Sequence, residues 1–298
     1  MASTVHTSLL IIGGAEDKVG RATVLRRFVK LAGGRRARIV VIPTASSFPD
    51  EAVETYTTIF TRLGATEVVA VAPPPRPVAA PETMVRAIDN ATGIFMTGGN
   101  QLKLSQYFVG TPLAEALCRA HARGAVVAGT SAGASIMSQF MISLGADGVT
   151  PRQRIGQLTS GLGLLPGVIV DQHFDQRARY GRLISLVAGS PNLLGMGIDE
   201  DTAAEVRDGR TLTVMGSGAV FVVDARHAVS DVPEARQDAP LMVSGAVVHS
   251  LPTGATFDLH TARLVGFVEK HPDVVVRAAF NAPDDSSHVG RTARRRTT

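Results

Sequence analysis

The segment Ala125-Val-Val-Ala-Gly129-Thr-Ser131-Ala-Gly133-Ala-Ser135 decides the fold class, because an apolar run ends abruptly at a serine between two glycines. Helical spacing resumes after the serine, so the segment predicts a strand, a sharp turn and a helix. The pattern G-x-S-x-G allows a tight turn that exposes the hydroxyl of Ser131 at the start of that helix. The amide of Ala132 and the helix dipole would then favour an oxyanion. Such turns also occur in α/β proteins for packing reasons alone, so the pattern makes Ser131 a candidate nucleophile and no more.

The chain before this segment alternates apolar runs with stretches of helical spacing. Strands that are apolar throughout and are each followed by a helix indicate a parallel sheet with helices on both faces, a doubly wound α/β fold. The predicted strands are 9–12, 38–43, 67–72 and 93–99, and the predicted helices are 19–32, 50–63, 84–91 and 112–123.

After Ser131 the period changes. We expect a loop over the site at 145–160, a strand at 164–170, a helix at 179–188 and a strand at 193–198. Short alternating segments from 202 to 224, with turns at Asp208-Gly209 and Gly216-Ser-Gly218, predict an antiparallel C-terminal edge, and 245–260 predicts another hairpin. No repeat or composition break divides the chain, so we expect one α/β domain over 1–281. A disordered basic tail is predicted at 282–298.

Composition limits the classes of function. The chain has 298 residues and one cysteine, Cys118, which we interpret as a small core residue in a reducing compartment. No secretory start or membrane-spanning run is present, so a cytoplasmic protein is expected. The net charge is +4, but the arginines are dispersed, and no tryptophan and three tyrosines leave few platforms for stacked bases. We therefore expect neither nucleic acid nor membrane as a partner.

Cofactor motifs are missing. Gly13-Gly14, with the next glycine at 20, does not make G-x-G-x-x-G, and the chain has no P-loop. It also has no H-E-x-x-H, no cysteine pair and no histidines at ligand spacing. We expect no metal and no organic cofactor.

An activated serine needs a base and, usually, a carboxylate that orients the base. His173 is the candidate base among eight histidines, because a predicted buried strand carries it to the same sheet edge as Ser131. The acid is expected within Asp199-Glu200-Asp201, which continues the next strand toward that edge. Residue spacing alone does not choose among these three, and the chain order serine, histidine, acid differs from that of α/β-hydrolases.

Six motifs in order resemble those of the cyanophycinase family, serine exopeptidases related to aspartyl dipeptidases. The resemblance covers about 9–268 and implies a class I glutamine amidotransferase-like, flavodoxin-like fold. The motifs are Gly13-Gly-Ala-Glu-Asp-Lys18, Ile42-Pro-Thr-Ala-Ser46, Thr97-Gly-Gly-Asn-Gln101, Gly129-Thr-Ser-Ala-Gly-Ala134, Asp171-Gln-His-Phe174 with Arg177, Arg179 and Arg182, and Gly197-Ile-Asp-Glu200.

The resemblance implies hydrolysis of cyanophycin, a poly-aspartate with arginine on each side chain, to β-aspartyl-arginine dipeptides. It assigns the nucleophile to Ser131, the base to His173 and the orienting acid to Glu200, with amides of Gly99 and Ala132 in the oxyanion hole. It also implies a homodimer. Substrate contacts fall on Gln101, Asp171, Gln172, Arg177, Arg179 and Arg182.

Two alternatives stay open at this point. An aspartyl or isoaspartyl dipeptidase of the same clan would share the triad but take small substrates. A binding protein without catalytic activity on this scaffold would need none of the three triad residues. The spacing of Arg179 and Arg182 alone would favour a solvated helix face over a substrate contact.

Overall fold

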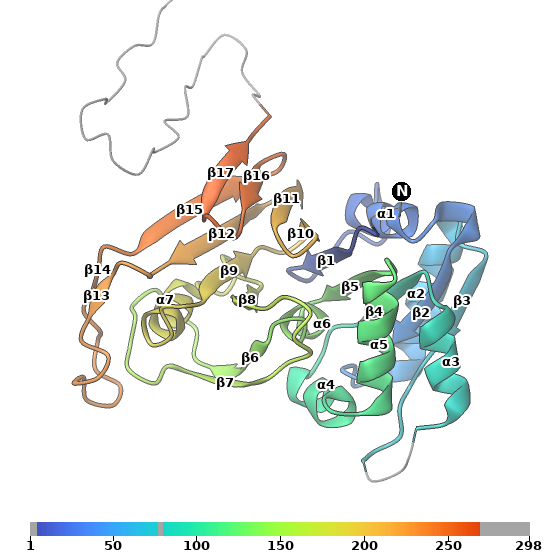
Figure 1. Cartoon of the computed structure of the whole chain (residues 1–298), viewed down its shortest axis with the longest axis horizontal. Helices are drawn as coiled ribbons and strands as arrows, with labels where there is room; N and C mark the ends of the chain where they lie inside the picture. Colours follow the sequence, from blue (N-terminus) through green and yellow to red (C-terminus); the bar gives the residue numbers. More distant parts are fainter. Residues whose placement is uncertain (1–4, 77–79, 269–298) are drawn as a thin grey trace, which may run out of the picture.

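The larger of two main sheets is built on five parallel strands in the order β1-β5-β4-β2-β3 (Figure 1). The computed structural model describes residues 5–76 and 80–268. Strands β1, β2, β4 and β5 are almost wholly buried, as expected for strands covered on both faces. Their bounds are β1 Ser8–Ile12, β2 Arg38–Ile42, β3 Glu67–Ala70, β4 Gly93–Met96 and β5 Val126–Thr130.

Helices cover both faces of this parallel part. Helices α1 and α2 pack on one face through a core that includes Phe28, Phe60 and Phe95, and α3 and α5 pack on the other. The predicted doubly wound α/β class is therefore confirmed. The helices are α1 Thr23–Leu31, α2 Pro49–Arg62, α3 Glu82–Asn90, α4 Gln101–Phe108, α5 Pro112–Ala122, α6 Ala132–Ser135 and α7 Tyr180–Ala188.

Antiparallel strands extend the sheet beyond β1, as the alternation after residue 202 predicted. They follow in the order β10, β11, β16 and β17, with bounds β10 Thr202–Arg207, β11 Thr211–Gly216, β16 Thr256–Asp258 and β17 Arg263–Gly266.

A second sheet, in the order β15-β12-β9-β8, packs beside the first. Its bounds are β8 Val168–Gln172, β9 Leu194–Ile198, β12 Ala219–Asp224 and β15 Val247–Pro252. Helix α7 covers its outer face through Phe174, Leu183 and Val187. Figure 1 shows this sheet and α7 on the left of the molecule, with the parallel strands on the right.

This second sheet corrects two expectations. The strand that precedes His173 does not join the sheet of Ser131, because β8 pairs only with β9 in the described ranges. The hairpin expected at 245–260 is also wrong: β15 pairs with β12, whereas β16 pairs with β11 and β17 in the larger sheet. Between β15 and β16 the chain passes from the second sheet to the larger one, where a hairpin turn was expected.

Three smaller differences concern local structure. The helix expected from residue 19 begins at Thr23, because the Asp17 carboxylate accepts hydrogen bonds from amides of Val19, Gly20 and Ala22 and holds a turn there. Helix α4 was not predicted. The loop expected at 145–160 ends in strand β7 Gly156–Ser160, which pairs with β6 Phe140–Gly145.

The predicted tail, 282–298, lies outside the described residues, so the proposed boundary at 281 stays a prediction. Over the two described ranges, no helix combines the length and the apolar character needed to cross a bilayer. Cys118 lies on the exposed face of α5, so its expected core position is wrong.

Candidate active site

Ser131 occupies the sharp turn between β5 and α6. Its backbone is left-handed (φ 53°, ψ −111°), a conformation that costs a residue with a side chain roughly 1–3 kcal/mol. The turn is compact because Gly129 and Gly133 pack closely: a Cβ on Gly129 would lie 2.1 Å from the Gly133 carbonyl oxygen. The following helix is a single turn, so the helix dipole expected to favour an oxyanion is small.

His173 and Glu200 come from neighbouring parallel strands of the second sheet. His173 follows β8, and Glu200 lies in the short link where the chain leaves β9 and enters β10 of the larger sheet. The two sheets therefore meet at the site, and each supplies part of it. This convergence brings together three side chains that are 42 and 27 residues apart in the sequence.

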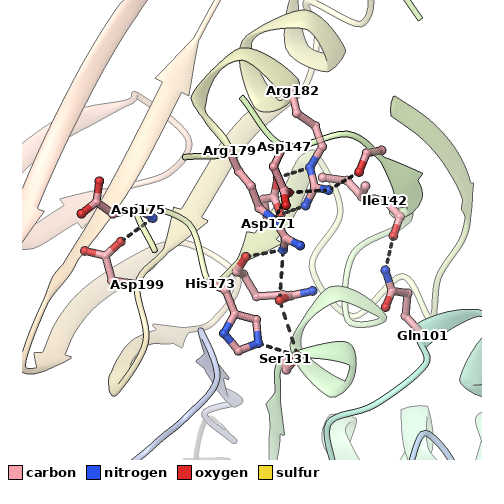
Figure 2. A network of polar contacts seen from close by, with 12 residues as sticks. Gln101, Ser131, Ile142, Asp147, Asp171, His173, Asp175, Arg179, Arg182 and Asp199 are labelled. Carbon is pink, nitrogen blue, oxygen red and sulfur yellow. Dashed lines mark hydrogen bonds and ion pairs between the residues drawn. The ribbon is translucent and has the colours of Figure 1, made fainter. Parts of the chain in front are cut away.

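The three side chains form one chain of hydrogen bonds. His173 Nε2 lies 3.0 Å from Ser131 Oγ, and His173 Nδ1 lies 2.5 Å from Glu200 Oε1 (Figure 2 shows the Ser131 and His173 pair). With the proton on Nδ1 donated to Glu200, Nε2 is free to accept the serine proton. This is the geometry that a nucleophile, a base and an orienting carboxylate require.

The surroundings of His173 keep its imidazole neutral over a wider pH range than usual. Burial lowers the pKa of His173, and the positive charges of Arg177 and Arg179 lower it further. The hydrogen bond that His173 donates to Glu200 raises the pKa, but desolvation is the larger effect, so the pKa lies below the ordinary value of 6.5. A neutral imidazole is the form that can accept the serine proton.

The predicted oxyanion loop lies against the serine. A Cβ on Gly98 would lie 3.3 Å from Ser131 Cβ and 3.8 Å from its Oγ. The next residue, Gly99, has φ +136°, a region that residues with side chains avoid, and a Cβ there would overlap the Ala45 carbonyl. Glycine is thus required at position 99, and glycine at position 98 leaves room for the backbone of the loop beside Ser131.

Three predicted substrate residues form a buried ionic cluster instead of an open surface. Asp171, which is 1% exposed, accepts two hydrogen bonds from Arg182, at 2.9 Å and 2.5 Å. Arg179 lies 3.5 Å from Asp171 Oδ1 and donates to the Gln172 carbonyl at 2.6 Å. All three charged side chains thus have partners inside the protein (Figure 2). Their contact with substrate stays a prediction, and the solvated helix face is wrong for Arg179 and Arg182, because both arginines are buried.

The other predicted substrate residues differ in exposure. Gln172 is buried, and its Oε1 lies 3.5 Å from Ser131 Oγ and 3.2 Å from Arg179 Nη1. Gln101 begins α4 and donates to the carbonyls of Ile142 and Ser143 in β6. Arg177 is exposed and has no ion pair among residues 5–76 and 80–268. Arg177 is therefore the predicted arginine whose guanidinium is available to a ligand.

Asp147 is a member of the cluster that sequence reasoning missed. It lies between β6 and β7, and its Oδ1 accepts a hydrogen bond from Arg179 Nε at 2.9 Å and lies 3.7 Å from Arg182 Nη1. The contact ties the β6–β7 hairpin to α7 beside the site. The apolar residues at 140–142 were the available signal for strand β6, but nothing local to Asp147 predicts its contact with Arg179.

A metal centre has no support in the part of the chain that the structure describes. There, no three His, Cys, Asp or Glu side chains are grouped so that they could hold an ion.

A chain of hydrogen bonds from serine through histidine to a carboxylate, at the edge of an α/β sheet, is the arrangement of serine hydrolases. The sequence profile of peptidase family S51 matches residues 9–214, and the chain belongs to this family. The predicted class, a serine peptidase, is confirmed.

Several cyanophycinases are similar to this chain over most of its length. That of Nostoc sp. (strain PCC 7120) is 39% identical over 267 residues, 89% of each protein. That of Synechococcus elongatus is 42% identical over 86% of this chain and 80% of its own length. That of Geminocystis herdmanii is 36% identical over 90% of this chain and all of its own length. The predicted family resemblance is confirmed.

Solved structures agree on the fold. A peptidase from an acI-B1 actinobacterium superposes with a TM-score of 0.57 at 22% identity, over 82% of this chain and 98% of that one. A putative peptidase E protein from Listeria monocytogenes EGD-e gives 0.50 at 16% identity, over 72% and 100%. At these identities the similarity concerns the fold alone.

Proposed function

We propose that the chain hydrolyses the poly-aspartate backbone of cyanophycin, with Ser131 as nucleophile, His173 as general base and Glu200 as the orienting acid. The observation that carries the proposal is the hydrogen-bonded chain of the three side chains, 3.0 Å and 2.5 Å long. The substrate is proposed from the relatives, which are cyanophycinases at 36–42% identity.

The proposed reaction has two acyl-transfer steps. His173 Nε2 takes the proton of Ser131 as Oγ bonds to the carbonyl carbon of an aspartyl residue. Amides of Gly99 and Ala132 hold the oxyanion in this proposal, and the imidazolium returns the proton to the leaving amine as the peptide bond breaks. β-Aspartyl-arginine leaves with this amine, and water then attacks the acyl-enzyme by the same route and frees the shortened polymer. The G-x-S-x-G turn acts as a nucleophile elbow in this scheme.

Substrate contacts are proposed for the predicted residues in two groups. Arg177 is exposed, and a guanidinium there can bind a substrate carboxylate by paired hydrogen bonds. Gln172 touches Ser131 and is suited to orient the bound substrate. The internal bonding of Asp171 with Arg182 favours a role in shaping the pocket for these residues and for Arg179.

The test is to identify the product by mass after incubation of the purified chain with cyanophycin. Release of β-aspartyl-arginine is expected, and Ser131→Ala is expected to release none while it keeps the fold, because alanine removes only the hydroxyl. Cleavage of free aspartyl or isoaspartyl dipeptides without cleavage of the polymer would favour the dipeptidase alternative. Failure of a serine-directed phosphonate to label Ser131 would favour a protein without catalytic activity.

A homodimer and a cytoplasmic location complete the proposal. The dimer follows from the family resemblance, and sedimentation of the purified chain tests it. The location is proposed from the composition, because a chain with a single cysteine cannot form an internal disulfide. Fractionation of cells that express the untagged chain tests it.

A further inference from the structure

The loop that follows β1, residues 13–17, contacts every segment that carries the proposed triad. This is possible because β1 lies between β5, which ends at the nucleophile, and β10, which begins just after the acid. Three consecutive carbonyl oxygens accept one amide each: Ile12 from Ser131 at 3.0 Å, Gly13 from His173 at 2.8 Å and Gly14 from Asp201 at 2.8 Å. The last residue of β1 and the first two residues of the loop therefore fix the positions of the three segments relative to one another.

The three amide donors share an unfavourable backbone conformation. Ser131, His173 and Asp201 have φ values of 53°, 48° and 48°. Residues with side chains keep left-handed backbone only where the surrounding structure holds them there. The hydrogen bonds to consecutive loop carbonyls are such restraints, one for each residue.

Gly14 also forms the surface on which the catalytic imidazole rests. A Cβ at this position would lie 2.3 Å from His173 Cε1 and 2.6 Å from Nε2. The ring therefore packs directly on the Gly14 backbone, which limits its movement away from Ser131.

Glu16 connects the same loop to the strand that carries the nucleophile. Its carboxylate is 3% exposed and accepts a hydrogen bond from the Thr130 hydroxyl at 2.5 Å. The other oxygen accepts one from the Tyr56 hydroxyl at 2.5 Å and lies 2.9 Å from Lys18 Nζ. Thr130 directly precedes Ser131, so the carboxylate restrains the strand end at which the sharp turn begins.

We infer that residues 13–17 are the positioning element of the triad, and that Glu16 is a positioning residue that acts on Ser131 through Thr130. The inference rests on the proposed function, because it concerns the placement of the proposed nucleophile. Neither Glu16 nor Thr130 exchanges a proton with substrate in this account. Their effect is on the distance and direction of Ser131 Oγ relative to His173 Nε2.

The experiment measures the rate at which a fluorophosphonate labels Ser131, with thermal unfolding measured in parallel. Glu16→Gln replaces one of the two accepting carboxylate oxygens by an amide donor and removes the negative charge that strengthens both contacts, so the restraint on Thr130 is weakened. Thr130→Val removes the hydroxyl, and Thr130→Ser keeps it. Glu205→Gln is the matched control: Glu205 is 4% exposed and paired with Arg27 at 2.6 Å, but it lies within β10 and does not contact the triad segments through its side chain.

We expect labelling to slow by about 10-fold to 100-fold in Glu16→Gln and Thr130→Val, since displacement by about 1 Å can cost that much. Thr130→Ser and Glu205→Gln are expected to label at close to the rate of the unmodified chain. Equal labelling rates in Thr130→Val and Thr130→Ser would overturn this inference but not the proposed function. An equal loss of labelling rate in Glu205→Gln and Glu16→Gln would do the same. An unmodified chain that is not labelled at Ser131 would overturn the proposed function as well.

Discussion

Two polar networks adjoin the candidate triad, and they hold it by different means. The end of β1 and the loop at 13–17 use main-chain carbonyls of residues 12–14, which accept the amides of Ser131, of His173 and of Asp201, the neighbour of Glu200. The cluster of Asp171, Arg179 and Arg182 uses charged side chains buried between β8 and α7. A backbone network should tolerate most side-chain changes but not the loss of a glycine, whereas a buried ionic cluster should fail when one charge is removed.

Removal of the central charge of the cluster gives the largest expected effect. Asp171→Asn leaves two buried guanidinium groups without their full partner, so the free energy of unfolding is expected to fall by about 3–5 kcal/mol. Urea denaturation measures this. Asp89→Asn, whose partner Arg119 is half exposed, is the control and should cost about 1 kcal/mol or less. Unchanged stability with a raised KM would instead show that Asp171 acts on substrate.

Loss of a glycine tests the backbone network. Gly14→Ala is expected to lower kcat/KM by about 100-fold, because the new methyl group would displace the imidazole of His173. Gly64→Ala is the matched control: its φ of +104° is close to the +109° of Gly14, but a Cβ there meets nothing within 4 Å. Alanine at either position has a similar positive φ. An equal loss of activity in the two variants would therefore show that the contact with the imidazole is not the cause.

Arg177 lies outside both networks and should therefore act on binding. Arg177→Gln is expected to raise KM for cyanophycin by about 10-fold with kcat little changed, since it removes one charge-assisted contact. Arg86→Gln, an exposed arginine paired with Glu82 on α3, is the control. A fall in kcat with constant KM would place Arg177 in the chemical step instead.

The smallest expected effect is on the pH profile. The positive charge of Arg177 helps to lower the pKa of His173, so Arg177→Gln should raise that pKa. Because the base must be neutral, the acid limb of kcat/KM should move to higher pH, by less than about one unit at an exposed site. The unmodified chain should have this limb below pH 6.5. If the acid limb of kcat/KM lies at the same pH in Arg177→Gln and in the unmodified chain, Arg177 does not affect the pKa of His173.

Much of the fold could be predicted because the signals are local. Apolar runs that end in glycine or serine predicted β1, β2, β4 and β5 to within a few residues. The positions of Ser131 and His173, each just after such a strand, were predicted by the same rule. The acid was not chosen by spacing, since Asp199, Glu200 and Asp201 all follow β9, and only the family resemblance selected Glu200.

The second sheet could not be predicted in this way. Strands β8 and β5 both begin with an apolar run and both are buried throughout, so periodicity does not reveal which sheet β8 joins. Strands β15 and β16 are separated by a turn of hairpin length, yet they pair in different sheets. The choice depends on strands distant in sequence, such as β9 and β11.

The burial of Arg179 and Arg182 could not be predicted from local spacing either. Their spacing on α7 suits either a solvated face or a substrate contact, and neither alternative anticipates burial against Asp171 and Asp147. Asp171, on β8, is 8 residues from Arg179, and Asp147, between β6 and β7, is 32 residues from it.

The amino-acid sequence by itself determined the α/β class, the strand ends and the residue types available at them, because apolar periodicity and glycine turns act over a few residues. The packing of the whole chain was needed to bring two sheets together at Ser131, to place Glu200 Oε1 within hydrogen-bond distance of His173, and to join the three segments through one glycine loop. Hydrogen bonds between distant segments depend on ångström-scale distances, and those distances exist only once both sheets are packed together.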